Sequence, residues 1–128
     1  MVAFLDTNVI TKMLDKDPVA IRMVEKTERP CTSIIVAGEL YYAALKSGRP
    51  EANLKIFREV ISNIEVIFID DVVTLSYGKI KTALKKKGTP IPDNDIWIAA
   101  CAMVHGLSIA TFDGHFSEIP ELNLVPVD

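Results

Sequence analysis

The sequence predicts a single α/β domain spanning residues 1–128, with three layers (α/β/α) built around a parallel sheet of four to five strands. The candidate strands are short and largely apolar, which is typical of strands covered on both faces. They alternate along the chain with helices, an order that favours right-handed crossovers between parallel strands. Because 49% of the 128 residues are hydrophobic, we expect one core that needs no disulfide or metal for stability.

The expected strands are identified by their apolar runs and by the turn residues that end them. The run Val-Ala-Phe-Leu stops at Asp6-Thr7-Asn8, three residue types that favour turns and helix N-caps. Asp113 comes two residues after another such run, Ser-Ile-Ala-Thr. The strands are expected at residues 2–5, 31–34, 65–69, 107–111 and, as a probable fifth, 122–125.

The expected helices are bounded by residues that start or stop helices. Asp17-Pro18 and Pro50 supply N-terminal signals, whereas Gly48, Gly88 and Gly106 follow the ends. Pro30 is expected to close the first pair of helices, and residues 89–92 to form a rigid linker. The helices are expected around residues 9–14, 18–24, 40–45 and 50–61, from Asp70 or Asp71 to Lys87, and from Asp93, Asn94 or Asp95 through 96–104.

The charge and the cysteines limit the class of protein. With 14 Lys plus Arg against 17 Asp plus Glu, the net charge is −3, which excludes a simple basic duplex-binding module. RNA would have to be held by local patches or through metal ions. Cys31 and Cys101 lie in apolar runs, as buried thiols do in a reducing cytosol. Neither cysteine is expected to be catalytic.

The sequence contains no recognisable targeting or membrane segment. The N-terminal apolar run has no basic region before it and ends at Asp6, too early for a signal peptide. The uncharged run between Asp95 and Asp113 is cut by Gly106 into two pieces that are too short to span a bilayer. We therefore expect a cytoplasmic protein with no membrane contact.

Four acidic residues lie in unusually apolar sequence surroundings. Asp6 and Asp113 stand at the carboxyl ends of two expected strands, the edge where open parallel sheets bind ligands. Glu39 has Ile35, Val36, Tyr42 and Ala43 as its helical neighbours, and Asp95 heads the most hydrophobic helix. Because an unpaired charge in a poorly solvated site costs several kcal/mol, something must neutralise these four acids.

Each acid also has an ordinary structural interpretation. Asp6 and Asp113 can be turn or N-cap residues, and Asp95 can be a helix cap, with Asp93 and Asn94 as rivals. Glu39 can pair with a distant lysine across the core. Four separate coincidences would be needed to place all these acids at one edge of the sheet.

A cluster of three or four carboxylates is a ligand set for Mg²⁺ or Mn²⁺, because both cations prefer oxygen donors. The His and Cys pairing that marks zinc sites is missing from the sequence. Carboxylate sites of this kind suit phosphoryl transfer, in which the metal polarises a phosphate and lowers the pKa of an attacking water. The sequence therefore indicates hydrolysis of a phosphodiester.

The whole chain resembles the PIN-domain ribonucleases, in particular the VapC-type toxins of toxin–antitoxin pairs. The most specific feature is an Asp-x-x-Ile-Ala-Ala helix that is followed by Gly and then by Thr-x-Asp. The Glu39 helix adds to the resemblance. The segments that carry it are Phe4-Leu5-Asp6-Thr7-Asn8-Val9-Ile10, Asn94-Asp95-Ile96-Trp97-Ile98-Ala99-Ala100 and Ile109-Ala110-Thr111-Phe112-Asp113.

The resemblance implies a metal-dependent endoribonuclease. The family's catalytic metal pocket would be lined by Asp6, Glu39, Asp95 and Asp113, with Mg²⁺ or Mn²⁺ as the cofactor. The fourth acidic position varies in the family, so Asp93 is an alternative or an outer residue there. Asn8 and Thr111 would orient carboxylates or waters. The implied partners are an RNA substrate, a small antitoxin protein and a second copy of the chain.

Several other residues have competing interpretations. The basic cluster of Lys79, Lys81, Lys85, Lys86 and Lys87 fits a solvated helix face better than an RNA grip. His115 is interpreted as a surface loop residue, the alternative being assistance to the leaving group. His105 belongs to a helix C-terminus and Trp97 to the core. Tyr41, Tyr42 and Leu45 crowd one helix and favour a subunit interface.

Two other enzyme or signalling classes fit the sequence less well. A phospho-receiver module needs a lysine after a late strand, and no lysine follows Leu107. A phosphatase with a nucleophilic Asp needs Asp-x-Asp near the N-terminus, where this chain has Asn8 at the third position. A PIN-like protein that binds RNA or a partner without cutting remains the alternative.

Overall fold

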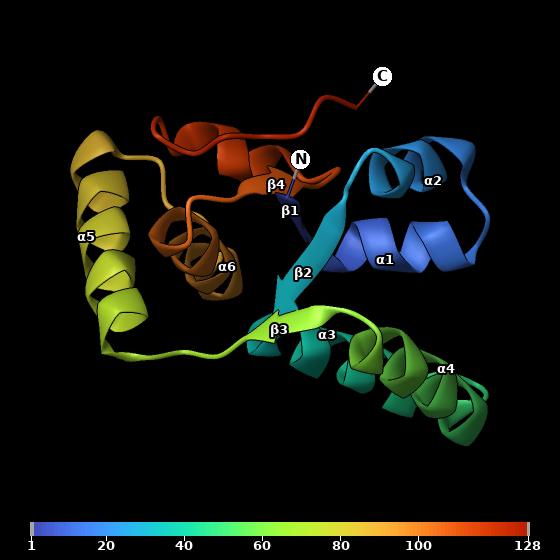
Figure 1. Cartoon of the computed structure of the whole chain (residues 1–128). Helices are drawn as coiled ribbons and strands as arrows, with labels where there is room; N and C mark the ends of the chain where they lie inside the picture. The colour runs from blue at the N-terminus through green and yellow to red at the C-terminus, as the bar shows by residue number, and fades with distance from the viewer. Residues whose placement is uncertain (1, 128) are drawn as a thin grey trace.

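The structure is a computed structural model that describes residues 2–127, and it contains a four-stranded parallel sheet (Figure 1). The strand order is β3-β2-β1-β4, so the first strand of the chain lies inside the sheet. Both neighbours of β1 run parallel to it. The strands are β1 (Val2–Leu5), β2 (Arg29–Ser33), β3 (Glu65–Ile67) and β4 (Ser108–Ala110).

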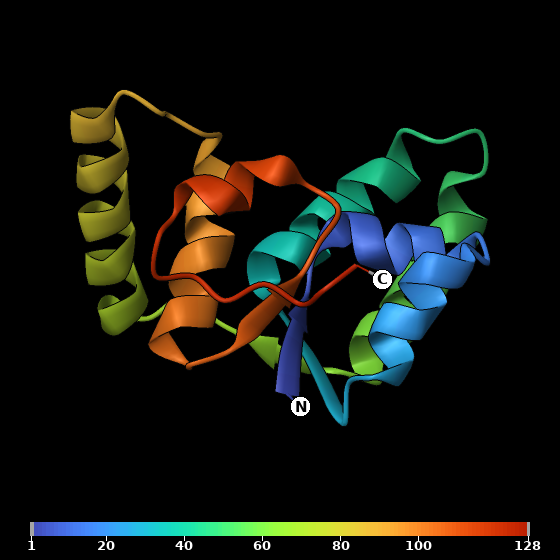
Figure 2. The same cartoon turned by 90° about the horizontal axis from the view of Figure 1, so that it is seen from above.

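Helices cover both faces of this sheet. In Figures 1 and 2, α5 and α6 lie on one side and α1 to α4 on the other, which confirms the three-layer prediction. From β1 to β3 each new strand is added on the same side of the previous one, and after β3 the chain returns across the sheet to β4 at the other edge. Because crossovers are right-handed, this last connection lies on the opposite face. The helices are α1 (Thr7–Leu14), α2 (Pro18–Glu25), α3 (Ile34–Leu45), α4 (Pro50–Ser62), α5 (Asp71–Lys87) and α6 (Asp93–Val104), followed by the 3-10 turn η1 (Gly114–Glu118).

The helix ends follow from local side-chain chemistry. Asp6, Asp17 and Asp70 cap α1, α2 and α5, because each carboxylate accepts a hydrogen bond from a backbone N–H of the first turn. Gly88 ends α5 with φ +76°, in the left-handed region that favours glycine. The structure thereby selects Asp70 over Asp71 as the cap.

Helix α6 starts at Asp93, one of the three expected starts, but none of the three residues is its N-cap. The N-cap position is Pro92, which makes no side-chain capping bond, and the helix begins at Asp93. Asp95 lies in the first turn, so its interpretation as a plain helix cap is wrong. Its carboxylate is therefore available for contacts outside its own helix.

The second strand begins earlier than its apolar run indicates. Pro30 lies inside β2, opposite Ala3 of β1, instead of closing the helix pair before the strand. Pairing of β2 with β3 starts only at Cys31, so Pro30 occupies a position with a strand neighbour on one side. A proline is tolerated where the missing N–H leaves no ladder hydrogen bond unmade.

The expected fifth strand is reduced to a single bridge. Leu124 pairs in parallel with Ile109, and Val125 N donates to Ile109 O at 2.9 Å, but no regular strand forms there among residues 2–127. β3 and β4 are likewise shorter than their apolar runs. A run of apolar residues indicates that a segment is buried, whereas the length of a strand depends on pairing with a neighbouring strand.

The core lies between the sheet and α3 and α6. Phe4, Leu40, Ile98 and Ile109 are fully buried, and α6 is buried along most of its length as predicted. Trp97 is only half-buried and stacks on Tyr77 with ring centroids 3.9 Å apart, which corrects its assignment to the core. Within the described part of the chain, no helix is long and apolar enough to cross a membrane.

Both cysteines are free and buried, as their apolar surroundings predict. Burial raises the pKa of the Cys31 thiol and of the Cys101 thiol to about 11. A thiol with such a pKa is protonated at neutral pH and is a poor nucleophile. The structure therefore agrees with a packing role for both residues.

Candidate metal and active site

The acidic residues singled out above occupy one end of the parallel sheet. Asp6 follows β1, and Asp113 follows β4 by three residues. Asp95 comes from the first turn of α6, and Glu39 from the middle of α3. Burial is the main cause of the raised pKa values of Asp6 and Asp95; in addition, the charges of Asp95 and Glu39 raise the pKa of Asp6, and the charge of Asp113 raises that of Asp95. The four residues therefore belong to one electrostatic group.

Asp6 is the most buried of the four acids, at 4% exposure. Its carboxylate accepts hydrogen bonds from Thr111 Oγ1 at 2.7 Å, from Thr7 N at 2.8 Å and from Asn8 Nδ2 at 3.4 Å. Burial nevertheless raises the pKa of Asp6 to about 6, and the neighbouring acids add to the effect. The hydrogen bonds only partly compensate the buried charge.

Asp95 and Asp113 meet at the imidazole of His115. His115 Nδ1 lies 2.9 Å from Asp95 Oδ2 and 3.0 Å from Asp113 Oδ1. One donor atom from each of these three residues lies within 4.8 Å of the others. Burial raises the pKa of Asp95, and the hydrogen bond to Asp95 raises the pKa of His115.

The position of His115 corrects its interpretation as an ordinary loop residue. Its side chain is 50% exposed, yet the ring is directed at two of the candidate metal ligands. Asp113 Oδ1 accepts a hydrogen bond from His115 N at 2.9 Å, and this local turn brings the ring back toward Asp95. The sequence signal for this turn is the spacing Asp113-Gly114-His115, since an Asp side chain often accepts a hydrogen bond from the backbone N–H two residues later.

Glu39 is held by neutral donors and not by a lysine. Thr7 Oγ1 donates to Glu39 Oε1 at 2.6 Å, and Asn94 Nδ2 lies 3.3 Å from Oε2. Among residues 2–127 no Lys or Arg forms an ion pair with Glu39, so the alternative of a distant lysine is wrong. Its negative charge remains without a cation.

Asn8 and Thr111 lie where they orient the acids. Asn8 Oδ1 accepts a hydrogen bond from Phe112 N at 3.1 Å, while its amide nitrogen faces Asp6. Thr111 Oγ1 donates to Asp6 Oδ2 and accepts from Asp113 N at 2.9 Å. These contacts tie the end of β1 to the end of β4.

Replacing Thr111 by Val should destabilise the protein by about 1–3 kcal/mol, because a buried carboxylate oxygen and the Asp113 N–H both lose a partner while the shape is kept. Thr111→Ser, which keeps the hydroxyl, is the matched control. Urea unfolding of the three proteins measures the effect. Equal stability of the Val and Ser variants would show that this hydroxyl does not hold the site together.

Asp93 is directed away from this group. Its Oδ1 pairs with Lys81 Nζ at 3.0 Å and accepts a hydrogen bond from Tyr77 OH at 3.1 Å. The bond to Lys81 lowers the pKa of Asp93, whereas the pKa of Asp95 is raised. The structure thus places the neighbouring residue Asn94, and not Asp93, against the candidate site.

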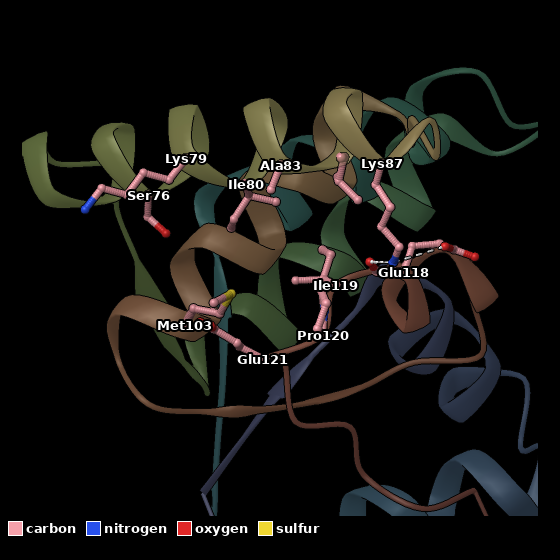
Figure 3. Close-up of a pocket in the computed structure, with 11 residues that line it drawn as sticks. Ser76, Lys79, Ile80, Ala83, Lys87, Met103, Glu118, Ile119, Pro120 and Glu121 are labelled. Carbon is pink, nitrogen blue, oxygen red and sulfur yellow. Dashed lines mark hydrogen bonds and ion pairs between the residues drawn. The ribbon is translucent and has the colours of Figure 1, made fainter.

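The lysines of α5 are partly engaged outside the site. Lys81 pairs with Asp93, and Lys87 lies 3.7 Å from Glu118 Oε2. A cavity of about 320 Å³ lies between α5 and the segment after η1 (Figure 3), lined by residues that include Lys79, Ile80, Ile119 and Pro120. None of the four acids lines this cavity, so it is separate from the candidate site.

The donor set fits a divalent cation. Carboxylates of Asp95 and Asp113 converge with an imidazole nitrogen, and Asp6 and Glu39 add negative charge beside them. The raised pKa values of Asp6 and Asp95 mark an excess of partly buried negative charge. A divalent cation compensates such an excess with oxygen and nitrogen ligands.

Comparison with known proteins points to one family. The PIN domain profile matches residues 3–122. The tRNA(fMet)-specific endonuclease VapC of Salmonella typhimurium is 36% identical over 123 residues, which cover 94% of this chain and 93% of that protein. Ribonuclease VapC2 of Haemophilus influenzae is 34% identical over 109 residues, covering 84% and 83% of the two chains. The solved structure of VapBC2 from Rickettsia felis bound to a promoter DNA fragment aligns with a TM-score of 0.89 and 30% identity, covering 100% of both chains.

Proposed function

The chain belongs to the PIN-domain family, and on that premise we propose that it is a divalent-metal-dependent endoribonuclease and the toxin of a toxin–antitoxin pair. The resemblance inferred from the sequence motifs is thereby confirmed. The observation that carries the proposal is the convergence of four acids at the carboxyl end of the sheet, with their charges only partly compensated. A module that only binds RNA has no need for this costly arrangement.

In the proposed site, Asp6, Glu39, Asp95 and Asp113 are the catalytic carboxylates. Asp95 and Asp113 face the same point in space and are suited to hold Mg²⁺ or Mn²⁺. When bound, the cation polarises the scissile phosphate and lowers the pKa of the attacking water. Asp6 and Glu39 add negative charge that strengthens cation binding and orients water beside it.

Neutral side chains fix the orientation of these carboxylates. Thr111 and Asn8 hold Asp6, while Thr7 and Asn94 hold Glu39. Removing a group that orients a metal ligand in this way typically lowers metal affinity or activity by roughly 10-fold to 100-fold. We therefore expect the four polar residues to act through the acids they contact.

Removing divalent cations should abolish RNA cleavage, since the carboxylates by themselves repel a phosphodiester. Dialysis against a chelator followed by readdition of Mg²⁺ or Mn²⁺ should restore cleavage of a labelled structured RNA. The measurement is the initial rate of internal cleavage, resolved from end-trimming by the product lengths. Undiminished cleavage in the presence of chelator would contradict the metal-dependent function.

The proposed antitoxin is a small protein that inactivates the site. The relatives with solved structures include VapBC toxin–antitoxin complexes from Rickettsia felis and Salmonella typhimurium. We expect an antitoxin segment to place an Arg or Lys against Asp6, Glu39 and Asp95, because a cation neutralises a carboxylate cluster and displaces metal. Such a contact also relieves the repulsion among the acids.

The proposed homodimer rests on apolar side chains exposed along α3. Tyr42 is 65% exposed and Leu45 is 61% exposed. Sedimentation at micromolar concentration should show a dimer that Leu45→Glu dissociates, because a charge on a buried interface is costly. Leu75→Glu, on the exposed face of α5, is the comparison. A wild-type monomer would contradict the proposal, and dissociation by Leu75→Glu alone would move the interface to α5.

A further inference from the structure

The two histidines of the chain have different surroundings. His105 ends α6, and its Nδ1 forms a hydrogen bond to Cys101 O at 3.0 Å. The Nδ1 atom of His115 instead lies between the carboxylates of Asp95 and Asp113. An all-carboxylate site does not account for this imidazole.

We propose that His115 binds the catalytic cation through Nδ1, and that this nitrogen ligand makes the site prefer a first-row transition metal such as Mn²⁺ over Mg²⁺. The inference deepens the proposed function and rests on it. The ligands are then two carboxylates and one imidazole, in place of the oxygen-only set that the sequence predicts.

The spacing of the donor atoms supports a shared cation. Neighbouring ligands of an octahedral cation with bond lengths of about 2.1 Å lie about 3.0 Å apart. His115 Nδ1 is 2.9 Å from Asp95 Oδ2 and 3.0 Å from Asp113 Oδ1, and one donor atom of each residue fits within 4.8 Å. The three side chains therefore already have the spacing of ligands on one side of a cation.

The local fold holds the ring in this place. Asp113 caps η1 through the His115 N–H, and Phe116 in the same turn is fully buried. Lys87 Nζ donates to Glu118 O at 2.9 Å, which fastens the end of the turn to α5. The side chain of Asp95 is 12% exposed and that of His115 is 50% exposed. The proposed cation position is therefore open to water and to a phosphate on the side of His115.

The chemistry of the ligands decides the metal preference. Mg²⁺ binds oxygen almost exclusively and keeps its waters, whereas imidazole suits transition metals. A competing explanation is that a protonated His115 bridges Asp95 and Asp113 and excludes a cation. The two explanations predict opposite effects of removing the ring, because a ligand strengthens cation binding and a competitor weakens it.

The test measures the affinity of the purified full chain for Mn²⁺ and for Mg²⁺. Electron paramagnetic resonance of the free Mn²⁺ gives the Mn²⁺ affinity, and competition with Mg²⁺ gives the Mg²⁺ affinity. His115→Asn should weaken Mn²⁺ binding about tenfold or more and Mg²⁺ binding by less. His115→Asp should shift the preference toward Mg²⁺, because it supplies oxygen in place of nitrogen. His105→Asn is the matched control and should bind both ions as the wild type does. Circular dichroism checks that each variant is folded.

Unchanged or stronger Mn²⁺ binding by the folded His115→Asn variant would overturn the ligand assignment. If Asp95→Asn still abolished RNA cleavage in that case, the proposed ribonuclease function would stand without the histidine ligand. A wild-type protein that binds neither ion would overturn both proposals. Loss of Mn²⁺ preference in His115→Asn alone, with His105→Asn unaffected, would support the assignment.

Discussion

Asp6→Asn and Asp95→Asn should each reduce RNA cleavage by at least about a thousandfold, because each should remove several kcal/mol of transition-state stabilisation that depends on a metal-binding carboxylate. The asparagine keeps the size of the side chain, and in Asp6→Asn it can still cap α1, so the fold should persist in both variants. Asp95 contributes an oxygen beside His115, whereas Asp6 contributes the most buried charge of the site. Initial rates on a labelled RNA, with Mn²⁺ present, measure the effect.

Asp71→Asn is the matched control for these variants. Asp71 also lies in the first turn of a helix, but it is exposed and belongs to α5. Its replacement should leave the cleavage rate within about twofold, since exposed charges far from a site contribute little. Cleavage at the wild-type rate by either Asp6→Asn or Asp95→Asn would rule out the assigned site.

We expect the metal-free protein to lose about 2 kcal/mol of stability through Asp6 as the pH rises from about 4 to about 6, out of a full contribution of about 3 kcal/mol. Burial raises the pKa of Asp6 from 3.8 to about 6, so the folded state binds the proton more tightly than the unfolded chain. The favourable contribution is complete below the unfolded pKa and is lost as the pH rises through the folded pKa. The raised pKa values of Asp95 and His115 act in the same direction at their own pH ranges.

Urea unfolding in the presence of chelator, repeated from pH 4 to pH 7.5, measures this contribution. Subtracting the curve of Asp6→Asn from that of the wild type isolates Asp6, while Asp71→Asn should parallel the wild type. Saturating Mn²⁺ should restore stability at the upper end of the range, because the cation binds only the folded site. A difference curve that is flat between pH 4 and pH 6 would show that burial does not raise the pKa of Asp6 in the folded protein.

The sequence by itself determined the fold class and the acids of the candidate site. Apolar runs alternating with helices predicted the parallel sheet, and the N-cap chemistry of Asp6 and Asp17 predicted two helix starts, whereas Asp70 and Asp71 remained alternatives for a third. Asp6, Glu39, Asp95 and Asp113 were identifiable because their neighbours along the chain are apolar. These signals are local, since each depends on residues within about one helical turn.

Tertiary structure alone decided which polar groups meet in space. His115 contacts Asp95, which lies 20 positions earlier in the chain, and Asn94 rather than Asp93 faces Glu39. Leu124 forms a single bridge with Ile109 instead of a fifth strand. An apolar run becomes a strand only where successive residues pair with a neighbouring strand. Hydrogen bonds between distant side chains depend on how crossovers and turns bring strand ends together, and no periodicity in the sequence encodes that geometry.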